Sequence, residues 1–128
     1  MIEVTDAEFE AMVATGIDAI PERFAVKLDN VAITWQDTPD WWQRAKMRLP
    51  PWQSLFGLYE GIPKTRRGSN YSLVLPDKIT IFRQPLAYAA RNPDQLAALV
   101  KKTVWHEVGH HFGLSDAEIH ALEDKQTA

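Results

Sequence analysis

The segment that most constrains the fold is a helix predicted between Asn92 and Gly113. Asn92 is a suitable N-cap, proline is favoured at the first helical position, and glycine suits the left-handed residue that ends many helices. The 20 residues from Pro93 span about 30 Å. Gly109 indicates that the backbone of another segment approaches this helix closely. Apolar residues lie on several of its sides, which predicts a central, buried helix: Leu96, Leu99, Val100, Val104, Trp105, Val108 and Phe112.

The N-terminal part of the chain is expected to form one helix and one strand. Thr5 and Glu8 have the spacing of a capping box. Apolar residues then recur at intervals of three and four between Phe9 and Ile20, which predicts a helix with one apolar face. Pro21 ends this helix or begins a new turn. Residues 31–37 are rich in β-branched and aromatic side chains and therefore predict a strand.

The elements around the central helix are predicted from strand and capping patterns. Residues 71–75 and 78–83 resemble two strands of a hairpin, joined by a tight Pro-Asp connection. A short helical turn is expected over residues 86–91. After the central helix, Ser115 and Glu118 form a second capping box, which predicts a final helix.

Residues 38–70 form a long segment with little periodicity. It contains Trp41, Trp42 and Trp52, together with four prolines and three glycines. Six basic and two acidic residues give it a net charge of +4, whereas the whole chain carries −3. We expect a solvated loop with a short helix around residues 41–47, whose tryptophans cover the core. The alternative interpretation is a binding surface.

Composition limits the classes of protein to consider. The chain has 128 residues, 45% hydrophobic and 24% charged, which predicts a single soluble domain over residues 1–128. Its small net charge argues against a nucleic-acid or membrane-surface protein as a whole. The acidic N-terminus does not resemble a signal peptide, and no apolar run reaches the roughly 18 residues of a membrane span. We therefore expect a cytoplasmic monomer. Because the chain has no cysteine, any metal must be bound by nitrogen and oxygen ligands.

Three of the four histidines lie in the sequence His-Glu-Val-Gly-His-His-Phe-Gly-Leu-Ser-Asp, residues 106–116. His106 and His110 are four residues apart, so their imidazoles project from one face of the predicted helix and can bind one metal ion. Glu107 lies about 100° further around the helix, where it can act as a general base on a metal-activated water. His111 points about 100° away from His110 and is expected in the core or behind the ligands.

A catalytic zinc site needs a third protein ligand in addition to two histidines. Asp116 follows the turn expected at Gly113 and lies six residues after His110, so its carboxylate can return to the ion. The same aspartate suits the first turn of the final helix, and the two roles are compatible. His120 and Glu123 remain alternative third ligands. A histidine-rich helix end without metal is the competing interpretation of the whole motif.

With these residues, the chain resembles the zincin metallopeptidases, and more narrowly a small bacterial family of minimal zinc metallopeptidases, a former domain of unknown function. The resemblance covers most of the chain. It implies an α+β, compact zincin-like fold, in which a small mixed sheet packs against the active-site helix and is accompanied by N-terminal and C-terminal helices. It rests above all on residues 106–116, with support from Gly57-Leu-Tyr-Glu-Gly-Ile-Pro63, Leu75-Pro-Asp-Lys-Ile79 and Phe82-Arg-Gln-Pro85.

The resemblance also implies a ligand set. Zn²⁺ would be bound by His106, His110 and Asp116, with Glu107 as the base. The pattern His-x-x-x-His-x-x-Gly-x-x-Asp is similar to that of metzincins with an aspartate ligand. All three methionines precede the helix, however, so no downstream Met-turn lies beneath the metal.

The predicted function is zinc-dependent hydrolysis of peptide bonds in a peptide or protein substrate. Glu107 would take a proton from the attacking water and pass it to the leaving amine. Strand 78–83 is a candidate sheet edge on which an extended peptide could add as a further strand. A donor to the oxyanion is expected among Tyr59, Tyr71 and His120.

The alternative function belongs to another class, a metal-stabilised interaction module with little or no turnover. Residues 38–70 would then be the binding surface for an acidic protein or for nucleic acid, and the small net charge of the whole chain makes nucleic acid the less expected of the two. In a third possibility, the same segment covers a latent enzyme until a partner displaces it.

Overall fold

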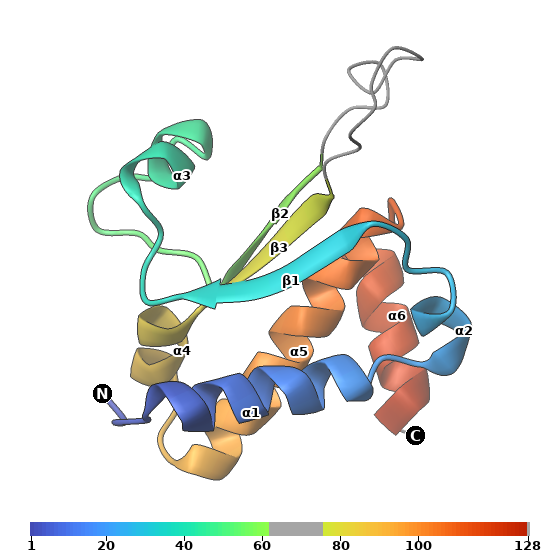
Figure 1. Ribbon diagram of the computed structural model, residues 1–128, viewed down its shortest axis with the longest axis horizontal. Coiled ribbons are helices and arrows are strands. Elements are labelled where there is room, and N and C mark those ends of the chain that lie inside the picture. Colours follow the sequence, from blue (N-terminus) through green and yellow to red (C-terminus); the bar gives the residue numbers. More distant parts are fainter. Residues whose placement is uncertain (62–75, 128) are drawn as a thin grey trace.

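The computed structural model describes residues 1–61 and 76–127. The predicted strand 71–75 and Tyr71 lie outside these ranges. The helices are α1 (Asp6–Asp18), α2 (Glu22–Ala25), α3 (Trp41–Lys46), α4 (Arg83–Ala89), α5 (Pro93–His111) and α6 (Asp116–Thr127). The strands are β1 (Val31–Gln36), β2 (Gly57–Glu60) and β3 (Asp77–Phe82), which confirms the α+β class (Figure 1). None of the described helices is long and apolar enough to cross a membrane.

The three described strands form a mixed sheet in the order β1-β3-β2. β1 runs parallel to β3, with Val31 opposite Asp77, whereas β2 is antiparallel to β3, with Gly57 opposite Ile81. The prediction that residues 78–83 form a sheet edge is therefore wrong, because β3 is paired on both sides. β2 was not predicted, since a four-residue strand that begins with glycine has a weak local signal and depends on its partner for pairing.

One face of the sheet is covered by helices, with α5 in contact with α1, α4, α6 and two strands. Figure 1 shows α1, α4, α5 and α6 on one side of the sheet and α3 apart from them on the other. The predicted burial of α5 is confirmed, because its apolar side chains share one core with side chains of the sheet and of the other helices. The fully buried members include Phe9, Ile79, Ile81, Leu96, Val100, Val104 and Val108.

The helix ends follow the local capping signals. The backbone N–H of Glu8 donates to Thr5 Oγ1 at 3.1 Å, that of Gln95 to Asn92 Oδ1 at 2.8 Å, and that of Glu118 to Ser115 Oγ at 3.2 Å. Gly113 has φ of +76°, the left-handed conformation expected after α5. The boundaries of α4 differ from the prediction: it begins at Arg83 rather than at residue 86, because a proline is tolerated in the first turn of a helix.

The three tryptophans between β1 and β2 do not cover the core. Trp41, Trp42 and Trp52 are 69%, 76% and 83% exposed, so the expectation that they are buried is wrong. The short helix predicted around residues 41–47 is present as α3.

Gly109 sets the distance between α5 and α6. A Cβ atom at this position would lie 2.6 Å from both Cδ1 and Cγ1 of Ile119, a fully buried side chain on α6. The close approach predicted at Gly109 is therefore made by a side chain and not by a backbone. Since Asp116 is the first residue of α6, this contact also fixes where its carboxylate lies relative to α5.

We expect Gly109→Ala to destabilise the fold by about 1–3 kcal/mol, because the overpacking at Ile119 outweighs the gain in helix propensity. Ile119→Ala alone should cost about 2–5 kcal/mol through the cavity it creates. In the double variant the added methyl group enters that cavity, so the loss should be smaller than the sum of the single losses. Urea denaturation of the four proteins measures this coupling, and strictly additive losses would contradict the contact.

Candidate metal centre

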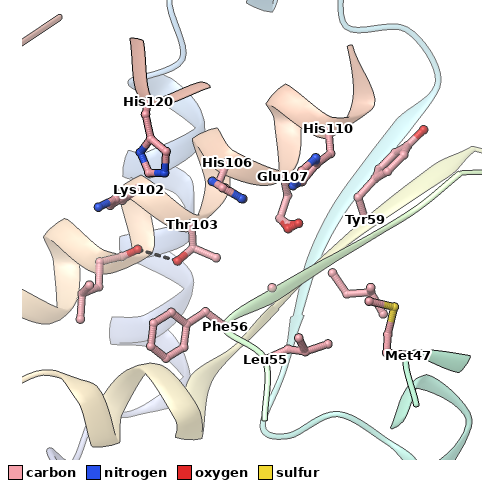
Figure 2. A pocket seen from close by; sticks show the side chains of 13 residues that line it. Met47, Leu55, Phe56, Tyr59, Lys102, Thr103, His106, Glu107, His110 and His120 are labelled. Carbon is pink, nitrogen blue, oxygen red and sulfur yellow. Dashed lines mark hydrogen bonds between the residues drawn. The ribbon is translucent and has the colours of Figure 1, made fainter. Parts of the chain in front are cut away.

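Two histidines of α5 and the first residue of α6 place three donor atoms together. Asp116 Oδ1 lies 3.2 Å from His106 Nε2 and 3.5 Å from His110 Nε2. One ligand atom from each residue lies within 4.8 Å of the others, the only such group of three found in the described ranges. Figure 2 shows His106 and His110 projecting from the same side of α5.

The chain returns to the histidines through a tight turn. The backbone N–H of Gly113 donates to the carbonyl of His110, and that of Leu114 to the carbonyl of Gly109, both at 3.0 Å. With its positive φ, Gly113 reverses the chain within a few residues, so that α6 starts beside the end of α5. Asp116 is thereby the first residue of α6, as expected from the sequence, and its carboxylate lies beside the two histidines, where the predicted role of third ligand requires it.

The two donor separations from Asp116 fit zinc, and all three donor atoms lie within 4.8 Å of one another. Zinc ligands at about 2.0–2.1 Å in tetrahedral geometry lie about 3.3 Å from one another, which agrees with the 3.2 and 3.5 Å separations from Asp116. Two imidazoles and one carboxylate are also a suitable set for a borderline-soft ion. The side chains of His106, His110 and Asp116 are 31%, 36% and 70% exposed, so the group is accessible to solvent.

His120 and Glu123, the alternative third ligands, lie outside this group of donors. His120 Nδ1 is instead 3.5 Å from Glu123 Oε2, one turn further along α6. The ring of His120 remains close to the centre, with its centroid 6.2 Å from that of His106. The structure thus brings Asp116, rather than either alternative, to the two histidines.

Glu107 is a buried carboxyl group beside the donors, with only 7% of its surface exposed. It lies between α5 and β2, where a Cβ on Gly57 would come within 3.1 Å of its Cγ. The glycine therefore allows β2 to pack closely against this part of α5. Burial raises the pKa of Glu107 to about 7, and the nearby Asp116 carboxylate adds to the effect. Burial and the neighbouring His110 lower the pKa of His106, which favours the neutral imidazole that a metal requires.

A cavity of about 730 Å³ opens beside these groups. Figure 2 shows its walls: α5 on one side, β2 and the residues before it on the other, with His120 and Met47 further away. Glu107 and Thr103, one turn apart on α5, both face it. The apolar part of the wall consists of Met47, Leu55, Phe56, Leu58 and Leu99.

The three residues considered as oxyanion donors have different surroundings. His120 lines the cavity, and its side chain is 56% exposed. Tyr59 also lines the cavity, but its hydroxyl donates to Asp77 Oδ2 at 2.9 Å, and Figure 2 shows this hydroxyl directed away from Glu107. Tyr71 lies outside the described residues.

His111 lies apart from the metal donors, as expected from its angle around α5. Its Nδ1 is 3.1 Å from Asp77 Oδ2, and its ring makes an edge contact with Tyr59. Sequence reasoning did not anticipate that His111, Tyr59 and Asp77 meet, because each comes from a different element. Together they attach the end of α5 to β2 and β3.

Comparison with known proteins is consistent with this geometry. The model of the zincin-like metallopeptidase family matches residues 28–126, which include all three donors and Glu107. The chain therefore belongs to the zincin-like metallopeptidase family, as the resemblance implied. A search of curated proteins finds no match.

Zinc binding is expected to depend on the three donors. Replacing His106, His110 or Asp116 with alanine should weaken zinc binding by more than about 100-fold. The loss of a residue that only hydrogen-bonds to a metal ligand already lowers the metal affinity by up to that factor. Competition with a chromophoric chelator measures the affinity. His120→Ala is the matched control and should bind zinc like the wild type. A loss at His120 as large as at Asp116 would contradict the ligand assignment.

Ionisation of the buried Glu107 side chain should lower the free energy of unfolding of the metal-free protein at and above neutral pH. Because its folded pKa is raised from 4.5 to about 7, the folded state holds a proton that the unfolded chain releases, and stability is lost as the pH rises through this range. Glu107→Gln should remove this loss and stabilise the metal-free chain by about 2–3 kcal/mol at pH 8 but not at pH 4. Urea denaturation with a chelator at both pH values measures the difference. Equal effects at the two pH values would contradict it.

Proposed function

We propose that this chain is a zinc-dependent peptidase. The observation that carries the proposal is Glu107, a buried carboxyl group that faces the same cavity as His106 and His110. A structural zinc site has four protein ligands and needs no adjacent acid. Within the described residues the group contains three donors, which corresponds to the ligand count of a catalytic site.

Glu107 is suited to transfer protons during hydrolysis. Zinc, when bound by the three donors, would polarise the scissile carbonyl and acidify the attacking water. Glu107 accepts the proton from that water and delivers it to the leaving amine. Its pKa of about 7 in the metal-free protein suits a group that must both accept and release a proton near neutral pH.

The substrate is proposed to lie along β2 instead of β3. Gly57 and Leu58 line the cavity opposite α5, and β2 is the last strand of the described sheet on this side. An extended peptide placed beside them passes Glu107 and the metal donors. The apolar wall of the cavity then contacts the substrate side chains.

His120 is the proposed donor to the developing oxyanion. It enters the cavity from α6, and Glu123 contacts its Nδ1, so Nε2 lies on the opposite side of the ring. In its protonated form, imidazole donates through both nitrogens, one to the carboxylate and one to the substrate oxygen.

The alternative, a metal-stabilised module that binds an acidic partner, is favoured by one observation. The exposed tryptophans between β1 and β2 have no role in the core. This alternative leaves the buried Glu107 unexplained, because its carboxyl group destabilises the metal-free fold without contributing a ligand. A peptidase with a separate binding surface accounts for both features.

Hydrolysis of a quenched fluorescent peptide library by the zinc-loaded chain tests the proposal. Glu107→Gln should lower kcat by about 10²–10⁴-fold, because it removes the general base, while zinc affinity stays at the wild-type value. Glu10→Gln, an exposed carboxylate on α1, is the matched control and should be fully active. Hydrolysis that continues at the wild-type rate in Glu107→Gln would exclude this mechanism.

A further inference from the structure

Residues 41–56, called here the 41–56 segment, expose an unusual amount of aromatic surface. In addition to Trp41, Trp42 and Trp52, the segment contains two partly exposed apolar side chains, Met47 at 44% and Phe56 at 42%. The indoles of Trp41 and Trp42 pack edge to face, with centroids 4.7 Å apart, yet most of their surface remains in contact with solvent. Exposed apolar clusters of this kind are typical of interaction sites.

The segment holds these side chains on a well-anchored backbone. Asp40 accepts a hydrogen bond from the backbone N–H of Gln43 at 2.8 Å and so caps α3. The buried amide of Gln43 pairs with that of Gln36 at the end of β1, with distances of 3.2 and 3.3 Å. Arg44 Nη2 donates to the carbonyls of Pro50 and Gln53, both at 2.7 Å. The indoles are therefore presented by a preorganised segment, which reduces the entropic cost of binding.

The charge of the segment selects the kind of partner. Residues 41–56 contain three basic residues and no acidic residue, in a chain of net charge −3. Arg44 is engaged within the segment, whereas Lys46 and Arg48 are exposed. Lys46 also lies 3.4 Å from Glu60 at the end of β2. A surface with this charge is complementary to an acidic ligand.

The segment is continuous with the cavity beside the metal donors. Met47 and Phe56 belong both to its exposed surface and to the cavity wall, and Leu55 lines the same wall. Figure 2 shows Met47 and Leu55 beside β2, with Glu107 and Thr103 directed towards β2 from α5. A polypeptide that leaves the cavity on this side therefore meets the 41–56 segment.

We propose that the 41–56 segment is an exosite for an acidic, extended stretch of the polypeptide substrate. The inference rests on the proposed peptidase function and specifies its substrate class, namely proteins with an acidic stretch a few residues from the scissile bond. Tryptophan, arginine and methionine are the residues enriched at protein–protein contact sites. Anionic vesicles and single-stranded nucleic acid are the competing acidic ligands, and the binding experiment distinguishes both from an acidic polypeptide.

Binding is tested on full-length Glu107→Gln, which should hold substrate without cleaving it. Fluorescence anisotropy with a labelled glutamate–tyrosine copolymer is expected to show saturable binding that weakens with salt. A lysine–tyrosine copolymer should not bind. Preferential binding of phosphatidylglycerol vesicles or oligothymidylate, or no binding of the acidic copolymer, would overturn the inference.

Two sets of variants, each made in Glu107→Gln, locate the surface. Trp41→Ala/Trp42→Ala should raise the Kd at least about tenfold, and Lys46→Gln/Arg48→Gln several-fold with a weaker salt dependence. The matched controls are Tyr88→Ala, an exposed aromatic on α4, and Arg91→Gln/Lys101→Gln, two exposed cations elsewhere. Equal melting temperatures show that the variants are folded. Unchanged binding in both sets would overturn the inference.

The active chain separates this inference from the proposed function. On an unstructured acidic protein, Trp41→Ala/Trp42→Ala should raise KM about tenfold and leave kcat unchanged, whereas a short neutral peptide should be cleaved as by the wild type. Cleavage without any effect of these variants contradicts the exosite alone. Copolymer binding without cleavage contradicts the peptidase alone.

Discussion

The packing of Ile119 into the space beside Gly109 holds the two parts of the candidate metal centre together. His106 and His110 belong to α5, whereas Asp116 belongs to α6, so their donors meet only where the two helices are in close contact. A functional site tolerates errors of only about 0.5 Å in such distances. The absence of a side chain at Gly109 and the reversal at Gly113 are therefore as necessary to the centre as the ligands.

Helix α5 contributes side chains both to the hydrophobic core and to the candidate site. Its apolar positions are buried against α1 and β3, while two rows at four-residue spacing face the cavity: Leu99, Thr103 and Glu107, and Lys102, His106 and His110. The buried carboxyl group of Glu107 opposes folding when it is ionised. The apolar positions on the other sides of the helix offset this cost, as is usual where a site is built on a rigid core element.

The parts of the structure that could be predicted from sequence are those whose signals are local. Caps at Thr5, Asn92 and Ser115 mark the main helices, and the spacing of residues 106–116 sets the donors on them. The order of the strands could not be predicted, because the pairing of Gly57-Leu-Tyr-Glu with β3 depends on distant residues. The contact between Tyr59 and Asp77 is non-local for the same reason. The tryptophans were misplaced because apolar character normally indicates burial, and the proposed binding surface would be an exception to that rule.

The exposure of the 41–56 segment also bears on whether the proposed peptidase is latent. A segment that closed the site would cover the metal donors and bury its own indoles against them. Instead, the side chains of His106 and His110 are about one third exposed, and Trp42 is 76% exposed. Only the inner side chains of the segment, Met47, Leu55 and Phe56, reach the cavity, where they form a wall and leave the donors open. Among the described residues, the 41–56 segment therefore forms one wall of the cavity and does not cover the three candidate donors, as the proposed binding of substrate to this segment requires.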